Sequence, residues 1–298
     1  MHDPRIGRFF AVDPLTAKYP YYSSYAFSGN RVIDMIELEG LEPTDYESGL
    51  LAADSYNIYN GQRKEGEAHK MSPALLETGW ELNSTVDLEE TGVELTDEGS
   101  GFNSALYQRK TTDLDGNEYY EYAYVTQGSD PPTPNNLTDW GNNLQQPSGK
   151  VWLTSFSKNQ YMITAKNAQN LNAYFNYSNK TLLTFVGHSL GGGLASLNAR
   201  LTGRDAITFN AAALSPTTLQ TAQRILGDVN YMEWTSNITA YIVENEAVDY
   251  FQGLIDLQAE HDQLIYLPSP SYRKGLIQRV KNHGMGVVLS QMRSLGIE

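Results

Sequence analysis

The chain has 298 residues, a formal net charge of −14 and no cysteine. This acidity argues against a nucleic-acid partner, which needs a basic face, and against long-range attraction to anionic lipid surfaces. The lack of cysteine excludes disulfides, thiolate catalysis and cysteine-ligated zinc. No apolar run approaches the roughly 18 residues of a transmembrane helix. The first ten residues lack the apolar region of a signal peptide, so we expect export, if any, by another route or within a larger parent polypeptide.

The first 43 residues differ in composition from the rest of the chain. They are rich in Pro, Gly and Tyr and lack helical periodicity, which predicts short strands and turns. The motifs DPRIGRF, VDPL, KYPYYSSYAFSGN and IELEGLEP resemble the end of the RHS/YD-repeat-associated core that precedes toxin domains in bacterial polymorphic toxins. In many such proteins an aspartate-rich motif cuts the toxin free, whereas Glu37 and Glu39 stand here. The segment is therefore expected either to be cut or to be a docking strand of a parent shell.

Residues 44–298 are predicted to form a second, larger domain. The pattern predicts helices over 44–59, 73–82, 157–177, 217–226 and 288–295, and strands over 102–109, 119–126, 182–186, 206–212, 238–243 and 263–267. The Asp-Gly pair at 115–116 predicts a hairpin between the first two strands, and the proline-rich stretch at 130–134 predicts a surface loop or a lid. Alternating strands and helices of this length indicate an α/β domain, a mostly parallel sheet with helices on both faces.

The strongest chemical motif lies where the strand 182–186 meets a small-residue helix. The sequence there is Gly187-His188-Ser189-Leu190-Gly191. A G-x-S-x-G turn between a strand and a helix raises the serine hydroxyl clear of the sheet, and the glycines avoid collisions across the tight turn. The alternative is the turn of a nucleotide-binding fold, which has no use for a serine at its apex. The pattern therefore predicts Ser189 as a nucleophile.

A serine nucleophile needs a base within hydrogen-bonding reach and an acid that orients the base. α/β-Hydrolases supply them in the order Ser, Asp or Glu, His, and only His261 and His283 follow Ser189. His283 is favoured because His261 stands in a polar stretch typical of an exposed turn, although His283 could instead cap the last helix. The acid should follow the strand 238–243, where Glu246 and Asp249 are the candidates.

Three further stretches carry a family resemblance. GHSLGGGLASL followed by AITFNA resembles the class 3 (fungal-type) lipases of the α/β-hydrolase fold. In that family a hairpin of the form GF-x-x-A-L-Y and Y-x-x-A-Y leads into an Arg-Gly-Thr turn, which reads Gln127-Gly128-Ser129 here. The family's D-W-x-x-N-L motif follows at residues 139–144.

The resemblance also implies roles for single residues. Glu246-Ala247-Val248 fits the family's Asp-x-Val with glutamate as the acid, and His283 fits its late histidine. The oxyanion hole would be formed by the backbone N–H of Leu190, which directly follows the nucleophile, and by the turn at Gly128 and Ser129. No metal-ligand cluster is evident in the sequence, so we expect no metal and no cofactor.

The implied function is a serine esterase or phospholipase, of the A1 type, carried as the toxin of an RHS protein. We expect a lipid ester substrate, a neutralising immunity protein, and contact with the parent RHS shell or a secretion apparatus. The protein would be secreted or delivered to the periplasm or membrane surface of a target cell. Two alternatives stay open: a soluble carboxylesterase or peptidase, and a non-catalytic interaction module linked to RHS proteins.

Overall fold

The computed structural model describes residues 2–3, 8–9, 43–58, 71–112, 118–128, 155–176, 182–226, 237–253, 258–271 and 275–297. The chain divides into two compact units, residues 1–42 with 112–117, and residues 43–111 with 118–298. In the first unit, β1 (His2–Asp3) pairs antiparallel with β2 (Arg8–Phe9). The rest of the RHS-like segment lies outside the described residues.

The second unit is built on one large sheet. Its strands are β3 (Glu81–Leu82), β4 (Thr96–Asp97), β5 (Phe102–Thr112), β6 (Glu118–Thr126), β7 (Leu182–His188), β8 (Ala206–Phe209), β9 (Ile238–Val243) and β10 (Gln263–Leu267). They follow the order β10-β9-β8-β7-β6-β5-β3, and β4 also pairs with β5. All neighbouring pairs from β6 to β10 are parallel, while β3 and β4 run antiparallel to β5. The predicted mostly parallel sheet is confirmed.

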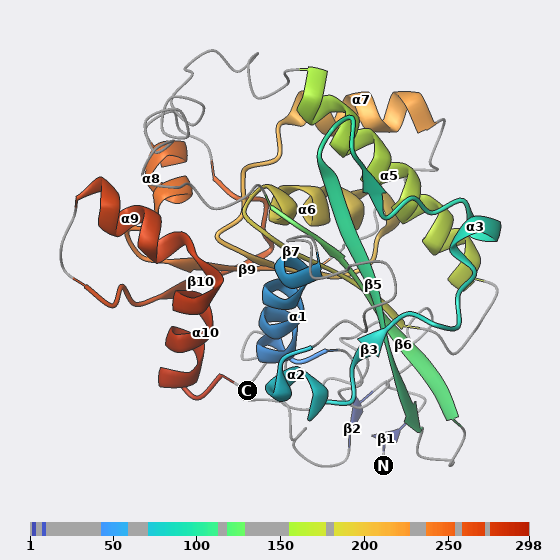
Figure 1. The fold of residues 1–298 in the computed structure, drawn as a ribbon, viewed down its shortest axis with the longest axis horizontal. Helices are drawn as coiled ribbons and strands as arrows, with labels where there is room; N and C mark the ends of the chain where they lie inside the picture. Colours follow the sequence, from blue (N-terminus) through green and yellow to red (C-terminus); the bar gives the residue numbers. More distant parts are fainter. Residues whose placement is uncertain are drawn as a thin grey trace. The chain divides into compact units, whose positions relative to one another are not determined.

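Helices cover both faces of the sheet (Figure 1). They are α1 (Asp45–Asn57), α2 (Pro73–Leu76), α3 (Leu88–Thr91), α5 (Ser155–Asn176), α6 (Leu190–Thr202), α7 (Pro216–Leu226), α8 (Ala247–Gly253), α9 (Leu276–His283) and α10 (Met285–Ser294). One core joins α5 and α6 to the sheet around Phe185, and the other joins α1 and α10 to it around Val186. Consecutive residues of β7 thus enter opposite cores, which explains why this strand reads as an unbroken apolar run. The fold is an α/β fold with helices packed on both faces of one large sheet.

Several predicted elements differ from the observed ones. The helix expected over 73–82 stops at Leu76, because Gly79 takes a left-handed backbone conformation (φ 80°) and β3 follows. The strand expected over 206–212 ends at Phe209, where Asn210 turns the chain with φ 43°. Helices α8 and α9 were not predicted, and α10 starts before residue 288. The predicted Asp-Gly turn and the proline-rich loop lie outside the described residues.

Candidate active site

The turn between β7 and α6 places Ser189 at the carboxyl end of the sheet. Ser189 has φ 59° and ψ −127°, a conformation that residues with a side chain rarely adopt. The backbone around it is held on both sides: its N–H donates to the carbonyl of Phe209 at 3.0 Å, and its carbonyl accepts from the N–H of Ala212 at 2.9 Å. Hydrogen bonds to the adjacent strand and to the loop that follows it therefore hold the strained backbone conformation of Ser189. The same kind of strained turn is found at a nucleophile elbow.

The glycines that flank Ser189 are required by close packing. A Cβ atom at Gly187 would lie 2.1 Å from the carbonyl oxygen of Gly191, and a Cβ at Gly191 would lie 2.1 Å from that of Thr126. Thr126 adds a hydrogen bond at the same place, from its Oγ1 to the Gly191 carbonyl at 2.7 Å. The start of α6 therefore lies directly against the end of β6, and only glycine fits there.

Three predicted side chains meet at this turn. Nε2 of His283 lies 2.8 Å from Oγ of Ser189, and its Nδ1 lies 2.6 Å from Oε2 of Glu246. All three residues are buried. A carboxylate can only accept, so Nδ1 carries the proton, and the free electron pair on Nε2 accepts from the serine hydroxyl. An arrangement of this kind can supply a nucleophile with a base and with an acid that orients the base.

Between the two candidate acids, the geometry joins His283 to Glu246. The Glu246 carboxylate also caps α8: it accepts from the N–H of Val248 at 2.8 Å and from the N–H of Asp249. Asp249 thus binds the Glu246 carboxylate through its backbone N–H. Burial, followed by the nearby charge of Glu246, raises the pKa of the Asp249 carboxyl, and Arg279 opposes this shift. Asn245, with φ 59°, makes the turn that brings Glu246 into the site.

His261 makes a local contact instead. Its Nδ1 lies 2.7 Å from the carbonyl oxygen of Ala259, two residues earlier in the loop before β10. This contact matches a histidine in a turn.

Gly128 and Leu190, the expected oxyanion-hole residues that the structure describes, both adjoin Ser189. A Cβ atom at Gly128 would lie 2.8 Å from Cβ of Ser189, so the Gly128 backbone passes next to the nucleophile. Leu190 is the first residue of α6, where backbone N–H groups lack intrahelical partners and the helix dipole is positive. Ser129 lies outside the described residues.

Two residues that sequence reasoning missed, Tyr56 and Asn210, belong to the same cluster. Oη of Tyr56 lies 2.6 Å from Nδ1 of His188, and Nδ2 of Asn210 donates to the His283 carbonyl at 2.8 Å. His188, predicted only as part of the elbow, places its Nε2 2.7 Å from that carbonyl. Asn210 directly follows β8, at the edge where α/β sheets hold their sites, but the sequence analysis placed it inside the predicted strand 206–212. Tyr56 carries no local signal.

The electrostatics of His188 differ from those of an exposed histidine. Burial, reinforced by the charge of His283, lowers the pKa of His188 to about 3, although its hydrogen bond to the His283 backbone opposes the shift. The ring is therefore neutral near pH 7. Within the described residues, no group of three or more His, Asp or Glu side chains is arranged to hold a metal ion.

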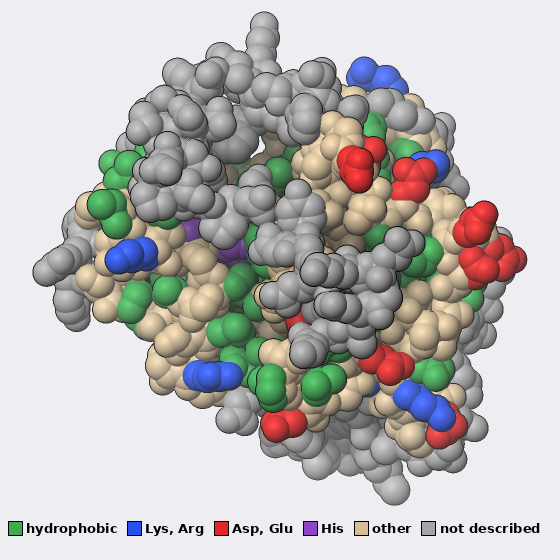
Figure 2. Space-filling view, viewed as in Figure 1, with side chains coloured by type: hydrophobic (Ala, Val, Ile, Leu, Met, Phe, Trp, Pro, Cys, Tyr) green, Lys and Arg blue, Asp and Glu red, His purple; other side chains and the backbone are tan. Residues whose placement is uncertain are grey.

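The site reaches the surface at the end of α9. Figure 2 shows histidine side chains at the surface in this region, beside hydrophobic side chains. Ser189 and His283 are 8% and 5% exposed. Among the helices that the structure describes, none is long and apolar enough to cross a bilayer.

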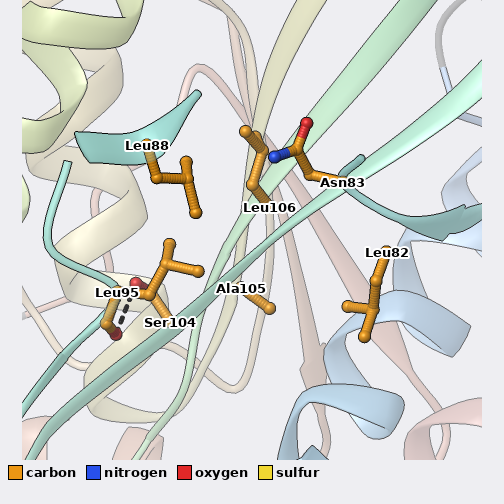
Figure 3. Close-up of a pocket in the computed structure, with 7 residues that line it drawn as sticks. All are labelled: Leu82, Asn83, Leu88, Leu95, Ser104, Ala105 and Leu106. Carbon is orange, nitrogen blue, oxygen red and sulfur yellow. Dashed lines mark hydrogen bonds between the residues drawn. The ribbon is translucent and has the colours of Figure 1, made fainter. Parts of the chain in front are cut away.

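A separate cavity of about 110 Å³ lies along β5 (Figure 3). It is lined by Leu82, Asn83, Leu88, Leu95, Ser104, Ala105 and Leu106, and the Ser104 hydroxyl donates to the Leu95 carbonyl. The cavity shares no residue with the cluster around Ser189. Ligand sites usually have about 300–1,000 Å³, so this cavity is too small for a lipid substrate.

Comparison with known proteins gives two kinds of match. The chain is similar to an extracellular phospholipase A1 from Serratia liquefaciens, with 34% identity over 175 residues, 59% of this chain and 44% of that protein. The match thus spans less than half of the relative's length. Among solved structures, the chain is similar to a mutant of MDLA from Penicillium cyclopium (TM-score 0.42, 14% identity, 76% of this chain and 80% of that one). It is also similar to a triacylglycerol lipase from Penicillium expansum (TM-score 0.39, 13% identity, 75% of this chain and 78% of that one).

A match to a protein family covers more of the chain. The phospholipase-like family described as Tle-like phospholipase domain matches residues 48–282, which include Ser189 and Glu246 and end one residue before His283. This stretch holds nearly all of the α/β-hydrolase unit. The chain therefore belongs to the family of Tle-like phospholipase domains.

Proposed function

We propose that this chain is a serine hydrolase that cleaves carboxylic ester bonds of glycerolipids and phospholipids, with phospholipase A1-type activity. The observation that carries the proposal is the continuous hydrogen-bonded series from Ser189 through His283 to Glu246, on a strained turn between β7 and α6. Membership of the phospholipase-like family supports a lipid substrate, and similarity to an extracellular phospholipase A1 supports the positional class.

The first half of the reaction transfers the acyl group to the enzyme. Oγ of Ser189 attacks the ester carbonyl carbon while its proton passes to Nε2 of His283. The negative charge that develops on the carbonyl oxygen is stabilised by the N–H of Leu190 and by the turn at Gly128 and Ser129. When the bond to the glycerol oxygen breaks, the imidazolium gives its proton to that oxygen, and the lysolipid alcohol departs.

The second half releases the fatty acid. Water attacks the acyl-serine carbonyl, its proton passes to Nε2 of His283, and the Ser189 oxygen takes that proton as it leaves. Glu246 stabilises the imidazolium that forms in both halves and fixes its Nδ1–H in place. The carboxylate is already oriented because two N–H groups at the start of α8 bind it.

The test is lipid-product analysis. Vesicles of a phospholipid with different acyl chains at its two positions are incubated with the protein, with Ser189→Ala and with Ser290→Ala. Ser290 is an exposed serine on α10 and serves as the matched control. We expect the wild type and Ser290→Ala to release the fatty acid of the first glycerol position, and Ser189→Ala to release none. Release from the second position alone would overturn the A1 assignment.

Parallel incubations separate the rival functions. A short-chain soluble ester and a peptide are offered under the same conditions. Hydrolysis of only the soluble ester would favour a carboxylesterase, and cleavage of only the peptide would favour a peptidase. Either result would overturn the lipid assignment.

The resemblance of residues 1–43 to an RHS core supports a toxin role for this hydrolase, with an immunity protein as its neutralising partner and secretion or delivery into a target cell. The test is growth of target cells that express the chain in their periplasm. We expect the wild type to stop growth and Ser189→Ala to permit it. Equal killing by both would favour the non-catalytic interaction module.

A further inference from the structure

The backbone carbonyl of His283 is bound by two buried side chains. His283 is the last residue of α9, and the last carbonyls of a helix have no intrahelical partner. Nε2 of His188 lies 2.7 Å from this oxygen, and Nδ2 of Asn210 lies 2.8 Å from it. His188 is the last residue of β7, and Asn210 directly follows the adjacent strand β8. The backbone carbonyl of His283 is thus anchored to the sheet that carries Ser189.

The proton positions in this contact follow from the groups involved. A carbonyl oxygen only accepts, and its two electron pairs suffice for both His188 and Asn210. Nε2 of His188 must therefore carry the ring proton, and Nδ1 of the neutral ring is left as an acceptor. The Tyr56 hydroxyl, 2.6 Å away, donates to it. Tyr56 therefore supplies the donor for Nδ1 in the tautomer of His188 that holds His283.

Asn210 binds a second element at the same time. Its Oδ1 accepts from the N–H of Val243 at 2.8 Å, at the end of β9, only three residues before Glu246. Asn210 is fully buried and has φ 43°, a left-handed conformation that asparagine tolerates well. The strand that leads to the acid and the carbonyl of the base are therefore held by one amide.

Tyr56 reaches the site only because residue 128 is glycine. A Cβ atom at Gly128 would lie 2.6 Å from the Tyr56 hydroxyl oxygen and 2.6 Å from the His188 carbonyl oxygen. The hydroxyl therefore lies between the backbone of the expected oxyanion turn and the ring of His188. Tyr56 belongs to α1, on the face of the sheet opposite α5 and α6.

We propose that Tyr56, His188 and Asn210 are positioning residues that hold the backbone of His283, so that its ring stays within hydrogen-bonding distance of Ser189. The proposal rests on the proposed function, because it assigns His283 the role of the base. None of the three needs to touch the substrate. Their effect is on the geometry of proton transfer, for which a displacement of about 1 Å can cost about 100-fold in rate.

The test compares two replacements of one residue. His188→Gln keeps an N–H donor near the position of Nε2, whereas His188→Leu fills similar space without a donor. With a soluble ester, we expect His188→Leu to lower kcat about 100-fold at nearly unchanged KM, and His188→Gln to recover most of that loss. Equal losses in both variants that track their thermal stability would overturn the proposal in favour of a merely structural role.

A tyrosine pair on one helix supplies a control. Tyr56→Phe removes the donor to Nδ1 of His188, and we expect its kcat to fall while the 15N resonance of Nδ1 shifts, because this nitrogen loses its hydrogen bond. Tyr46→Phe, also on α1, removes a buried hydroxyl that has no hydrogen-bond partner among the described residues. It should leave kcat and the Nδ1 resonance of His188 unchanged. A Tyr56→Phe protein with unchanged kcat and an unchanged Nδ1 resonance would contradict the assignment.

A readout without substrate separates this proposal from the hydrolase proposal. The Nδ1 proton of His283, bound to Glu246, should give a low-field 1H resonance in the wild type and in His188→Gln, but not in His188→Leu. If the wild type hydrolyses no ester while this pattern is seen, the positioning role stands and the hydrolase proposal fails. If the resonance is the same in all three proteins, the positioning role fails whatever their activity.

Discussion

The Nδ1 atom of His283 lies 2.6 Å from the Glu246 carboxylate, which is itself held by backbone N–H groups at the start of α8. The side chain that orients the base is thus also the cap of a helix. Because α8 packs on α9 through Val248, Phe251 and Val280, the helix that ends at His283 is packed against the helix that Glu246 caps.

This contact predicts that Glu246, and not Asp249, is needed for activity. Glu246→Gln keeps the shape but places an amide against Nδ1, so the ring is no longer held in the productive tautomer. We expect kcat for ester hydrolysis to fall about 10⁴-fold, as in a triad whose acid is replaced by its amide. Asp249→Asn should retain most of the activity. Steady-state kinetics of both variants checks this, and the reverse ranking would make Asp249 the acid.

Gly128 is predicted to be intolerant of any side chain. In Gly128→Ala the new Cβ atom would meet the Ser189 side chain, the Tyr56 hydroxyl and the His188 carbonyl, each within 2.8 Å. Overpacking of this kind costs about 1–3 kcal/mol of stability, and here it also displaces the nucleophile. We expect lower kcat and a lower unfolding midpoint in urea.

The matched glycine control is on α10. A Cβ atom added at Gly286 would meet no other atom within 4 Å, and the residue lies inside a helix. Gly286→Ala should therefore raise the free energy of unfolding by up to about 1 kcal/mol with kcat retained. A Gly128→Ala protein that is as active as Gly286→Ala would show that the turn adjusts.

His188 should make stability depend on pH. Its pKa in the folded state is about 3, below the ordinary value of 6.5, because of burial. Below pH 6.5 the unfolded chain therefore binds a proton that the folded chain excludes. The contribution of His188 to the free energy of unfolding is therefore fully present above about pH 6.5. It falls toward pH 3 by up to about 1.4 kcal/mol per pH unit.

The measurement is urea unfolding of the wild type and His188→Gln at pH 7.5, 6.5 and 5.5. Glutamine does not titrate, so the wild type should lose stability relative to the variant as the pH falls. If the free energies of unfolding of the two proteins depend on pH in parallel, His188 takes up its proton in the folded protein without leaving its site.

The core around α5 supplies a stability prediction independent of catalysis. Leu171 is fully buried between α5 and the sheet, whereas Tyr174, one turn later, is 44% exposed. Leu171→Ala should lower the free energy of unfolding by about 2–5 kcal/mol, because it removes apolar contacts and leaves a cavity. Tyr174→Ala should cost much less, since part of its ring is in water. Urea titration of both variants gives the comparison.

The sequence predicted the parts of the fold that repeat a simple pattern. The apolar strand β7, the small-residue helix α6 and the parallel strands β8 and β9 were placed within a few residues, because strands buried on both faces are mainly apolar and the helix follows the G-x-S-x-G turn. Helices α8 and α9 were missed. Each is short, and neither begins at one of the usual cap residues Ser, Thr, Asp or Asn, because Glu246 caps α8 and Gly275 precedes α9.

The residues of the candidate site differ in the same way, because some have a local signature in the sequence and others do not. Ser189 and His283 could be proposed from a motif and from chain order, because a nucleophile elbow has a local signature. Tyr56 could not, since it contacts His188 from 132 residues away in the chain and lies near the end of a helix without any local motif. The choice of Glu246 over Asp249 depends on which carboxylate faces the imidazole, a matter of side-chain direction at the start of α8.

The long reach of these contacts has a consequence for biosynthesis. Tyr56 meets His188, and Ser189 meets a histidine 94 residues further along, so the centre joins parts made at very different times. A ribosome that has translated the elbow has still to add the whole of β9, β10 and α9 before a base exists. Under the proposed chemistry, every nascent chain shorter than this is inert toward the lipids of the cell that makes it.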